Sequence, residues 1–134
     1  MRHLRIPMLF LVVLSLLALA SYRSLAGTSG FPALLGTWVQ DQTGPVVTHE
    51  RIYRFSRDGS YEFLFTARNT GSTNRRTLLR ERGKFAIRGN RLVISPNSGT
   101  PRAFPWRVEK DPYVGDVRLV LVLSDGTLDI YYRR

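Results

Sequence analysis

Regularly spaced turn signals constrain the fold of this chain more than any other feature. From Leu35 onward, short stretches of alternating apolar and polar residues are separated by turns, the clearest being Asp58-Gly59, Gly89-Asn90 and Asp125-Gly126. Alternation with a period of two is typical of strands that bury one face. No convincing helical period appears in this part of the chain. The pattern therefore predicts an all-β fold.

Each of these turns also predicts a register. A loop at Arg57–Gly59 pairs Phe55 with Tyr61 and Tyr53 with Phe63, which places aromatic rings on one face. A slip of one residue would scatter the apolar side chains over both faces. We expect Phe63 and Leu121 to be fully buried. The other two hairpins pair Ile87 with Leu92, Phe85 with Ile94, Leu123 with Leu128, Leu121 with Ile130, and Leu119 with Tyr132.

Eight strands can be placed in this way. Short connections between consecutive strands predict a small up-and-down antiparallel β-barrel, since closure removes the exposed strand edges of an open sheet. An open sandwich is the alternative. The expected strands are 35–40, 47–55, 61–67, 76–87, 92–95, 103–109, 117–123 and 128–133.

The first 26 residues have the features of a secretory signal peptide. Arg2 and Arg5 precede an apolar stretch from Met8 to Ala20, and small residues typical of a cleavage site follow near Ala20 and again near Ala26. The apolar stretch is short for a membrane span, although an uncleaved anchor is the alternative. We therefore expect export, to the periplasm or the exterior, with residues 27–34 as a linker and 35–134 as the barrel domain.

Charge and cysteine content narrow the possible partners. The chain contains no cysteine, so the exported domain must fold without disulfides. Cleavage after Ala26 would remove Arg2, Arg5 and Arg23 and lower the formal net charge from +10 to +7. This excess favours contact with anionic surfaces. Nucleic acid is not an expected partner of an exported protein, and a monomer is expected.

Catalytic chemistry has little support in the sequence. His49 is the one histidine of the expected mature chain, and with no cysteine a His/Cys metal cluster is excluded. No G-x-S-x-G nucleophile motif and no glycine-rich phosphate loop are present. The sequence therefore predicts a non-catalytic protein that carries no cofactor.

Several motifs together resemble the calycins, and among them the small bacterial lipocalin-like proteins. Gly36-Thr37-Trp38 opens the first strand, the hairpin from Phe55 to Tyr61 and the segment from Gly83 to Ile94 follow, and the chain ends in Arg133-Arg134. The resemblance implies that Trp38 packs across a closed barrel end, with an arginine of the last strand within about 6 Å of its ring. Strand parity favours Arg134 over Arg133 for this contact.

A basic stripe is predicted on the fourth strand. If Phe85 and Ile87 point inward, five basic side chains point outward, either as a solvated face or as a docking surface for an anionic partner. They are Arg76, Arg80, Arg82, Lys84 and Arg88.

The same parity places Glu81 and Arg51 inside the barrel. A charge in a small barrel must be paired or hydrated, so these two residues are expected either to form a salt bridge at the mouth or to orient the polar end of a ligand. A β-bulge near Gly83 would turn Glu81 outward. The residues expected to line a small, shallow pocket are Arg51, Tyr53, Tyr61, Phe63, Glu81 and Trp106.

The sequence is compatible with two functions. The first is a lipocalin-like protein that binds a small hydrophobic or amphipathic molecule. The second is a solid barrel that acts through its surface, as a docking module or as a secreted protease inhibitor whose segment 27–34 contacts the protease. A cavity of roughly 300 Å³ or more would favour the first.

Overall fold

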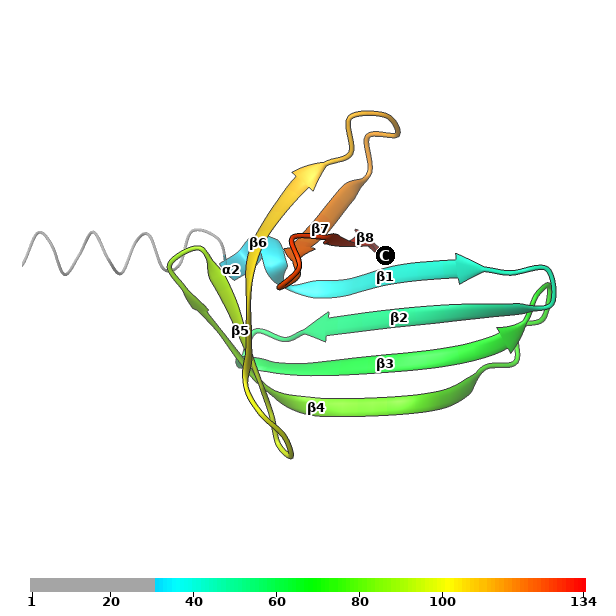
Figure 1. Cartoon of the computed structure of the whole chain (residues 1–134), viewed down its shortest axis with the longest axis horizontal. Coiled ribbons are helices and arrows are strands. Elements are labelled where there is room, and N and C mark those ends of the chain that lie inside the picture. The colour runs from blue at the N-terminus through cyan, green and yellow to red at the C-terminus, as the bar shows by residue number, and fades with distance from the viewer. Residues whose placement is uncertain (1–30) are drawn as a thin grey trace, which may run out of the picture.

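The computed structural model describes residues 31–134 of the chain. The predicted signal peptide, residues 1–26, lies outside the described residues. Eight antiparallel strands follow one another and close into a barrel, with β8 beside β1 (Figure 1). The predicted all-β, up-and-down barrel is therefore confirmed. Its strands are β1 (Gly36–Thr43), β2 (Val47–Phe55), β3 (Ser60–Asn69), β4 (Arg76–Arg88), β5 (Arg91–Pro96), β6 (Arg102–Lys110), β7 (Val117–Val122) and β8 (Leu128–Arg133).

Consecutive strands alternate in direction, so their connections lie alternately at the two ends of the barrel. We call the end with the turns at 56–59, 89–90 and 111–116 the sealed end, because the short helix α2 (Phe31–Leu34) precedes β1 there. The open end carries the connections at 44–46, 70–75, 97–101 and 123–127. No helix among residues 31–134 is long and apolar enough to cross a membrane.

Two of the three predicted hairpin registers are confirmed. Phe55 pairs with Tyr61 in the β2–β3 hairpin, and Phe85 pairs with Ile94 in the β4–β5 hairpin. Gly59 and Gly89 adopt φ angles of 85° and 62° in the two turns, a region that favours glycine. The aromatic face that the sequence indicates is thus formed by the expected pairs.

The register predicted for the β7–β8 hairpin is wrong by one residue. The Leu123 amide donates to the Thr127 carbonyl, so the loop contains three residues, 124–126, and not the expected four. Leu119 consequently pairs with Tyr131. Because strand side chains alternate between faces, this shift reverses every side chain of β8. Its inward residues are Asp129, Tyr131 and Arg133 in place of Leu128, Ile130 and Tyr132.

The core lies inside the barrel and is densest toward the sealed end. Leu34, from the segment expected to be a linker, is fully buried, so this residue packs as part of the barrel core. Leu121 is buried as predicted, whereas Phe63 is only half-buried. The buried members of the core are Leu34, Trp38, Tyr53, Phe55, Tyr61, Phe85, Leu92, Ile94, Leu119, Leu121 and Tyr131.

Strands β1–β4 are longer than the barrel that they help to close. β5 pairs only with the stretch of β4 from Gly83 onward, and β8 pairs with β1 only at Trp38 and Val39. The open-end halves of β1–β4 therefore pair only with one another and form a curved sheet that projects past the barrel (Figure 1). Gly83 permits the close approach of β5, because a Cβ atom there would lie 2.1 Å from the Ser95 carbonyl oxygen.

Candidate functional site

Trp38 closes the sealed end, as the sequence predicts. Its indole N–H donates to the Leu34 carbonyl at 2.7 Å, and its ring is fully buried. Gly36, two residues earlier, has a φ of 118°, which explains the need for glycine in the Gly-x-Trp motif. The guanidinium carbon of Arg133 lies 4.7 Å from the centre of the Trp38 ring. This cation–π contact joins the first strand to the last.

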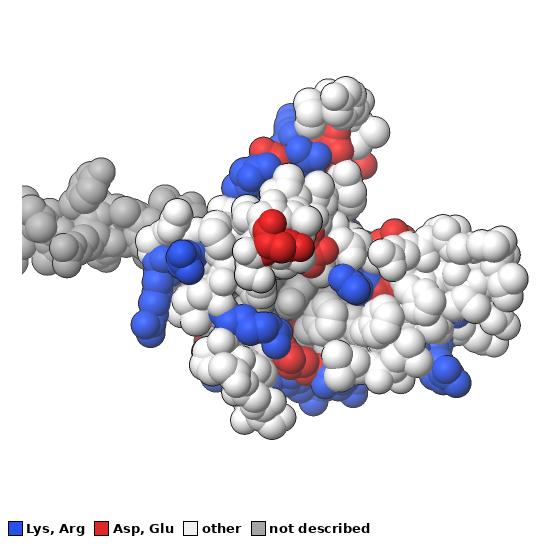
Figure 2. All heavy atoms as spheres, in the orientation of Figure 1, with Lys and Arg blue, Asp and Glu red and all other residues white. Residues whose placement is uncertain are grey.

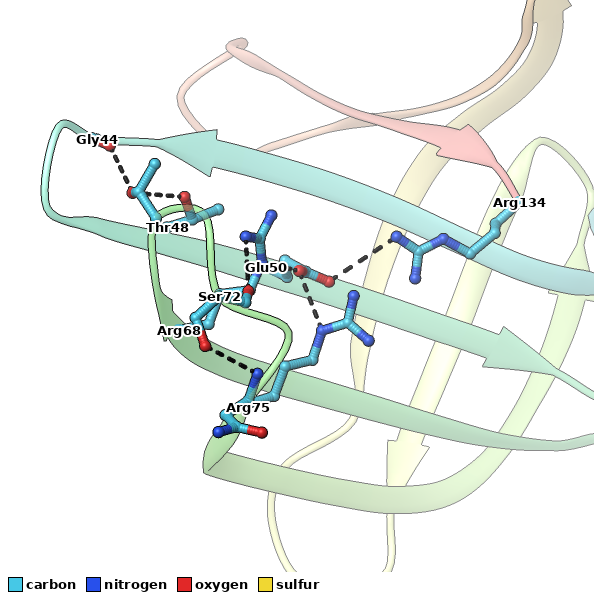
Figure 3. A network of polar contacts seen from close by, with 9 residues as sticks. Gly44, Thr48, Glu50, Arg68, Ser72, Arg75 and Arg134 are labelled. Carbon is cyan, nitrogen blue, oxygen red and sulfur yellow. Dashed lines mark hydrogen bonds and ion pairs between the residues drawn. The ribbon is translucent and has the colours of Figure 1, made fainter.

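The arginine favoured by parity, Arg134, is the wrong one. Arg133 lies directly opposite Trp38 in the β1–β8 pairing and also donates to the Ala33 carbonyl. The reason is the register of the β7–β8 hairpin, which turns Arg133 inward. Arg134 instead extends over the outer face toward Glu50 (Figure 3).

The outer face carries a buried carboxylate that sequence reasoning missed. Glu50 is 1% exposed, and its Oε1 accepts hydrogen bonds from Arg68 at 3.0 Å and Arg75 at 3.2 Å. Its Oε2 lies 4.0 Å from Arg134. The loop at 70–75 crosses this face and brings Arg75 over the sheet (Figure 3). Three segments of the chain are thereby held to one side chain.

The pKa of Glu50 reflects two opposing effects. Burial raises the pKa of this carboxyl group, but the hydrogen bonds and charges of Arg68 and Arg75 more than offset it, so that the pKa is lowered from 4.5. Glu50 is therefore ionised at neutral pH and forms a structural cluster. None of its partners projects into the barrel.

At the open end, Glu81 points inward, as predicted, but its partner differs from the expected one. It accepts a hydrogen bond from the Tyr61 hydroxyl at 2.7 Å and forms an ion pair with Arg102 at 2.5 Å. Arg51 is not its partner. The first residue of β6 reaches Glu81 because Arg102 pairs with Ile94, an inward position of β5. The predicted strand, 103–109, begins one residue later and therefore leaves out Arg102.

Hydrogen bonding and burial determine which groups of this cluster are charged at neutral pH. The hydrogen bond from Arg102 lowers the pKa of Glu81, and the same bond raises the pKa of Arg102. Burial raises the pKa of Tyr53 to about 12 and also raises that of Tyr61. Both phenols are therefore neutral beside this ion pair, and the Tyr61 hydroxyl donates its hydrogen bond to Glu81.

Arg51 occupies a different environment at the same end. Its side chain shares the inner face with Tyr53, and its guanidinium carbon lies 5.8 Å from the centre of the Phe65 ring, on which His49 also stacks. No carboxylate among residues 31–134 forms an ion pair with Arg51. Arg51 is partly exposed. It is therefore an inward-facing cation that is free to meet an anionic group.

A second polar cluster borders this region. Asp129 accepts hydrogen bonds from the Gln40 side chain at 2.7 Å and from the Tyr131 hydroxyl at 2.9 Å. Gln40 also donates to the Ile130 carbonyl, which extends the short β1–β8 seam. Asp129 and Tyr131 were missed because the predicted register turned both outward.

The aromatic residues predicted to line the site differ in position: some lie beside Glu81, and Trp106 packs against the core. The Tyr53 ring lies tilted at 45° to the Phe63 ring, with ring centres 4.7 Å apart, and meets Tyr131 edge-on at 5.2 Å. Tyr61 is buried and reaches the open end only through its hydroxyl group. Trp106 is half-buried against the core and pairs with Leu121. The structure thus brings Tyr53, Tyr61, Phe63 and Glu81 together.

The basic stripe of β4 is only partly as predicted. Arg80 and Arg82 point outward and share the Glu62 carboxylate, at 3.7 Å and 2.9 Å, with Arg54 as a third partner. Lys84 and Arg88 are exposed on the same side. Arg76 lies opposite Ala67, an inner-face position, because the register shifts between Phe65 and Thr66. This bulge lies well before Gly83, so Glu81 stays inward.

Charge is unevenly distributed over the visible face. Figure 2 shows acidic and basic side chains gathered over the barrel, whereas the projecting part of β1–β4 presents mostly uncharged atoms. Among residues 31–134, no three His, Asp or Glu side chains come together in a way that could hold a metal ion.

The closed eight-stranded antiparallel barrel fits a calycin-like fold. No protein family, curated protein or solved structure matches this chain.

Proposed function

We propose that this protein is an exported, non-catalytic, lipocalin-like binding protein that holds a small amphipathic molecule with an anionic head group at its open end. The observation that carries the proposal is Arg51, an inward-facing cation packed on Phe65 with no carboxylate partner among the described residues. Guanidinium groups bind carboxylates and phosphates through paired, charge-assisted hydrogen bonds. An anionic head group would supply the partner that this arginine lacks.

The apolar part of the ligand has a matching surface. Phe63 and Phe65 are half-buried on the inner face near Arg51, and the Leu79 side chain beside them is 51% exposed. Among residues 31–134, the sealed end offers no comparable surface, because Leu34 and Trp38 close it and are fully buried. The ligand would therefore lie along the inner face of the projecting sheet, in a shallow site.

Two carboxylates that already have partners set the limits of this site. Glu81 is already paired with Arg102, and Asp129 already accepts two hydrogen bonds, so neither requires a ligand cation. Their negative charges would repel an anionic head group placed beside them. The head group is therefore expected on the Arg51 side of the mouth.

A direct test compares two ligands of equal chain length. The mature protein would be titrated calorimetrically with dodecanoate and with dodecanol, both below the concentration at which they aggregate. We expect saturable binding of dodecanoate, at least about tenfold tighter than dodecanol, which corresponds to roughly 1.4 kcal/mol. Equal affinity for the two ligands would show that the protein does not recognise the anionic head group. Absence of saturable binding of either ligand would reject the proposed function.

Export and the natural ligand can be examined on the protein from its own host. N-terminal sequencing is expected to find a mature terminus near Ser21 or Gly27, and a chain that still begins at Met1 would favour a membrane anchor. Native mass spectrometry of the same sample is expected to show a retained anionic amphiphile. Protein that carries nothing and also fails the dodecanoate titration would contradict the binding function.

A further inference from the structure

The first half of β4 has an unpaired edge. Arg76–Arg82 pair with β3 on one side, but β5 pairs only from Gly83 onward, so on the other side this stretch has no strand partner among the described residues. In an antiparallel sheet the backbone groups of alternate residues point to alternate neighbours. Exposed edges of this kind can accept an added strand.

Two hydrogen bonds show which residues offer their backbone to this edge. The Phe85 amide donates to Gly59, on the β3 side, whereas the Arg82 carbonyl accepts from Asn97, on the opposite side. By alternation, Arg80 and Arg82 direct their backbone groups toward the unpaired edge. The Arg82 carbonyl is already engaged, which leaves the Arg82 amide and both backbone groups of Arg80 for a partner.

The side chains beside the edge combine positive charge with apolar surface. Arg80 and Arg82 are 54% and 61% exposed on the outer face, and together with Arg54 they share a single carboxylate, that of Glu62. The site is therefore cationic. The Leu78 and Leu79 side chains are 42% and 51% exposed. A hollow of about 400 Å³ lies against the edge, lined by Leu79, Arg80, Glu81, Arg82, Asn97 and Ser98.

We propose that the unpaired edge of β4 binds an extended acidic segment of a partner protein as an added strand. Such a segment would place acidic side chains beside Arg80 and Arg82 on the outer face and apolar side chains beside Leu79 on the inner face. Addition of a strand to an exposed edge supplies affinity through backbone hydrogen bonds and specificity through alternate side chains. The bulge at Leu78 limits the regular pairing, so a short strand of about five residues is expected.

Self-association through the same edge is disfavoured by its charge. A second copy that paired β4 with β4 would bring Arg80 and Arg82 against the arginines of the other molecule. Like charges opposite one another destabilise a strand pair, and basic side chains are a common protection of exposed edges. The charge therefore selects an acidic partner over a second copy of this chain.

The test uses peptides that separate strand pairing from simple charge attraction. The probe is a capped peptide of alternating glutamate and valine, about seven residues long. One control replaces each glutamate by lysine. A second keeps all charges but carries N-methyl groups at alternate residues, which removes the amide donors needed for pairing. Affinity is measured by fluorescence anisotropy, and hydrogen exchange is followed at the Arg80 and Arg82 amides.

We expect the acidic peptide to bind and to slow exchange at these two amides. Binding should weaken at least about tenfold with the N-methylated peptide, and as much when Arg80→Glu is combined with Arg82→Glu. The matched variant, Arg88→Glu with Arg91→Glu, carries the same charge change on the β4–β5 hairpin near the sealed end and should bind like the wild type. Dodecanoate titration and thermal unfolding verify that both variants are folded.

Three outcomes would overturn the proposal. If the N-methylated peptide bound as tightly as the unmethylated acidic peptide, the interaction would be charge attraction and not strand pairing. If the lysine peptide bound as tightly as the acidic peptide, the edge would not be selective for acidic segments. Binding to phosphatidylglycerol vesicles, with no binding of the acidic peptide, would assign the basic side chains to a lipid surface.

Discussion

The two ends of the barrel use arginine in different ways. At the sealed end, Arg133 stacks on Trp38 and donates to the Ala33 carbonyl, so that it joins β8, β1 and α2. At the open end, Arg51 also lies over an aromatic ring, Phe65, but without a carbonyl or carboxylate partner among the described residues. The first arginine is used for closure, and the second is available to a ligand. The comparison separates residues that hold the fold together from residues that we assign to binding.

The largest effect should follow from removing the side chain that fills the sealed end. Trp38→Ala creates a cavity in a fully buried site and is expected to lower the free energy of unfolding by about 3–5 kcal/mol. Phe63→Ala, at a half-buried site toward the open end, should cost less, about 1–2 kcal/mol. Urea unfolding followed by circular dichroism measures both. Equal losses would mean that the two ends are packed alike.

Glu50 should give the next largest effect and a pH dependence. Glu50→Gln leaves Arg68, Arg75 and Arg134 without their carboxylate, and we expect a loss of about 2–3 kcal/mol at neutral pH. Because the folded-state pKa of Glu50 lies below 4.5, the unfolded chain binds this proton more readily. The stabilisation is present above that value and is lost as the pH falls through the lowered pKa.

The variant should therefore show a shallower loss of stability between neutral pH and about pH 3 than the wild type. Glu62→Gln is the matched control, since Glu62 also forms ion pairs with three arginines but lies on an exposed face. Its effect on stability is expected to stay below about 1 kcal/mol. If both variants lost the same stability, burial of Glu50 would not be the decisive difference.

The two terminal arginines offer a smaller and sharper comparison. Arg133→Met removes the cation–π contact and the hydrogen bond to Ala33, and should cost about 1–2 kcal/mol. Arg134→Met loses only an ion pair at 4.0 Å and should cost less than about 0.5 kcal/mol. The reverse order of these two losses in thermal unfolding would contradict the observed β1–β8 register.

The sequence predicts the paired aromatic face of this barrel well because two tight turns define it. Asp58-Gly59 and Gly89-Asn90 each leave one favourable register, and the structure contains both. The β7–β8 hairpin differs because apolar residues occupy both faces of its strands, so a shift by one residue retains the apolar pairing. The alternation alone could not reject that shift, which reversed the predicted orientations of Asp129 and Arg133.

The charged groups were harder to predict for a related reason. The run Thr77-Leu78-Leu79 has no alternation that could locate the bulge, and the bulge turns Arg76 to the inner face. Glu50 was missed because the segment that covers it, residues 70–75, has no periodic pattern. Glu81 was placed correctly, but its ion pair depends on the offset between β4 and β6, which no single hairpin determines.

The smallest expected change in stability belongs to the residue that matters most for the proposed function. Arg51→Met keeps an apolar side chain over Phe65 and removes a cation that has no ion-pair partner among residues 31–134, so the free energy of unfolding should change by less than about 0.5 kcal/mol. The matched control is Arg57→Met, which alters an exposed arginine of the β2–β3 turn at the sealed end.

The most direct measurement is the affinity of the wild type and these two variants for dodecanoate, determined by calorimetric titration under one set of conditions. We expect Arg51→Met to bind at least about tenfold more weakly and Arg57→Met to bind like the wild type. Binding of dodecanoate by Arg51→Met with unchanged affinity would contradict the assignment of the anionic head group to the open end of the barrel.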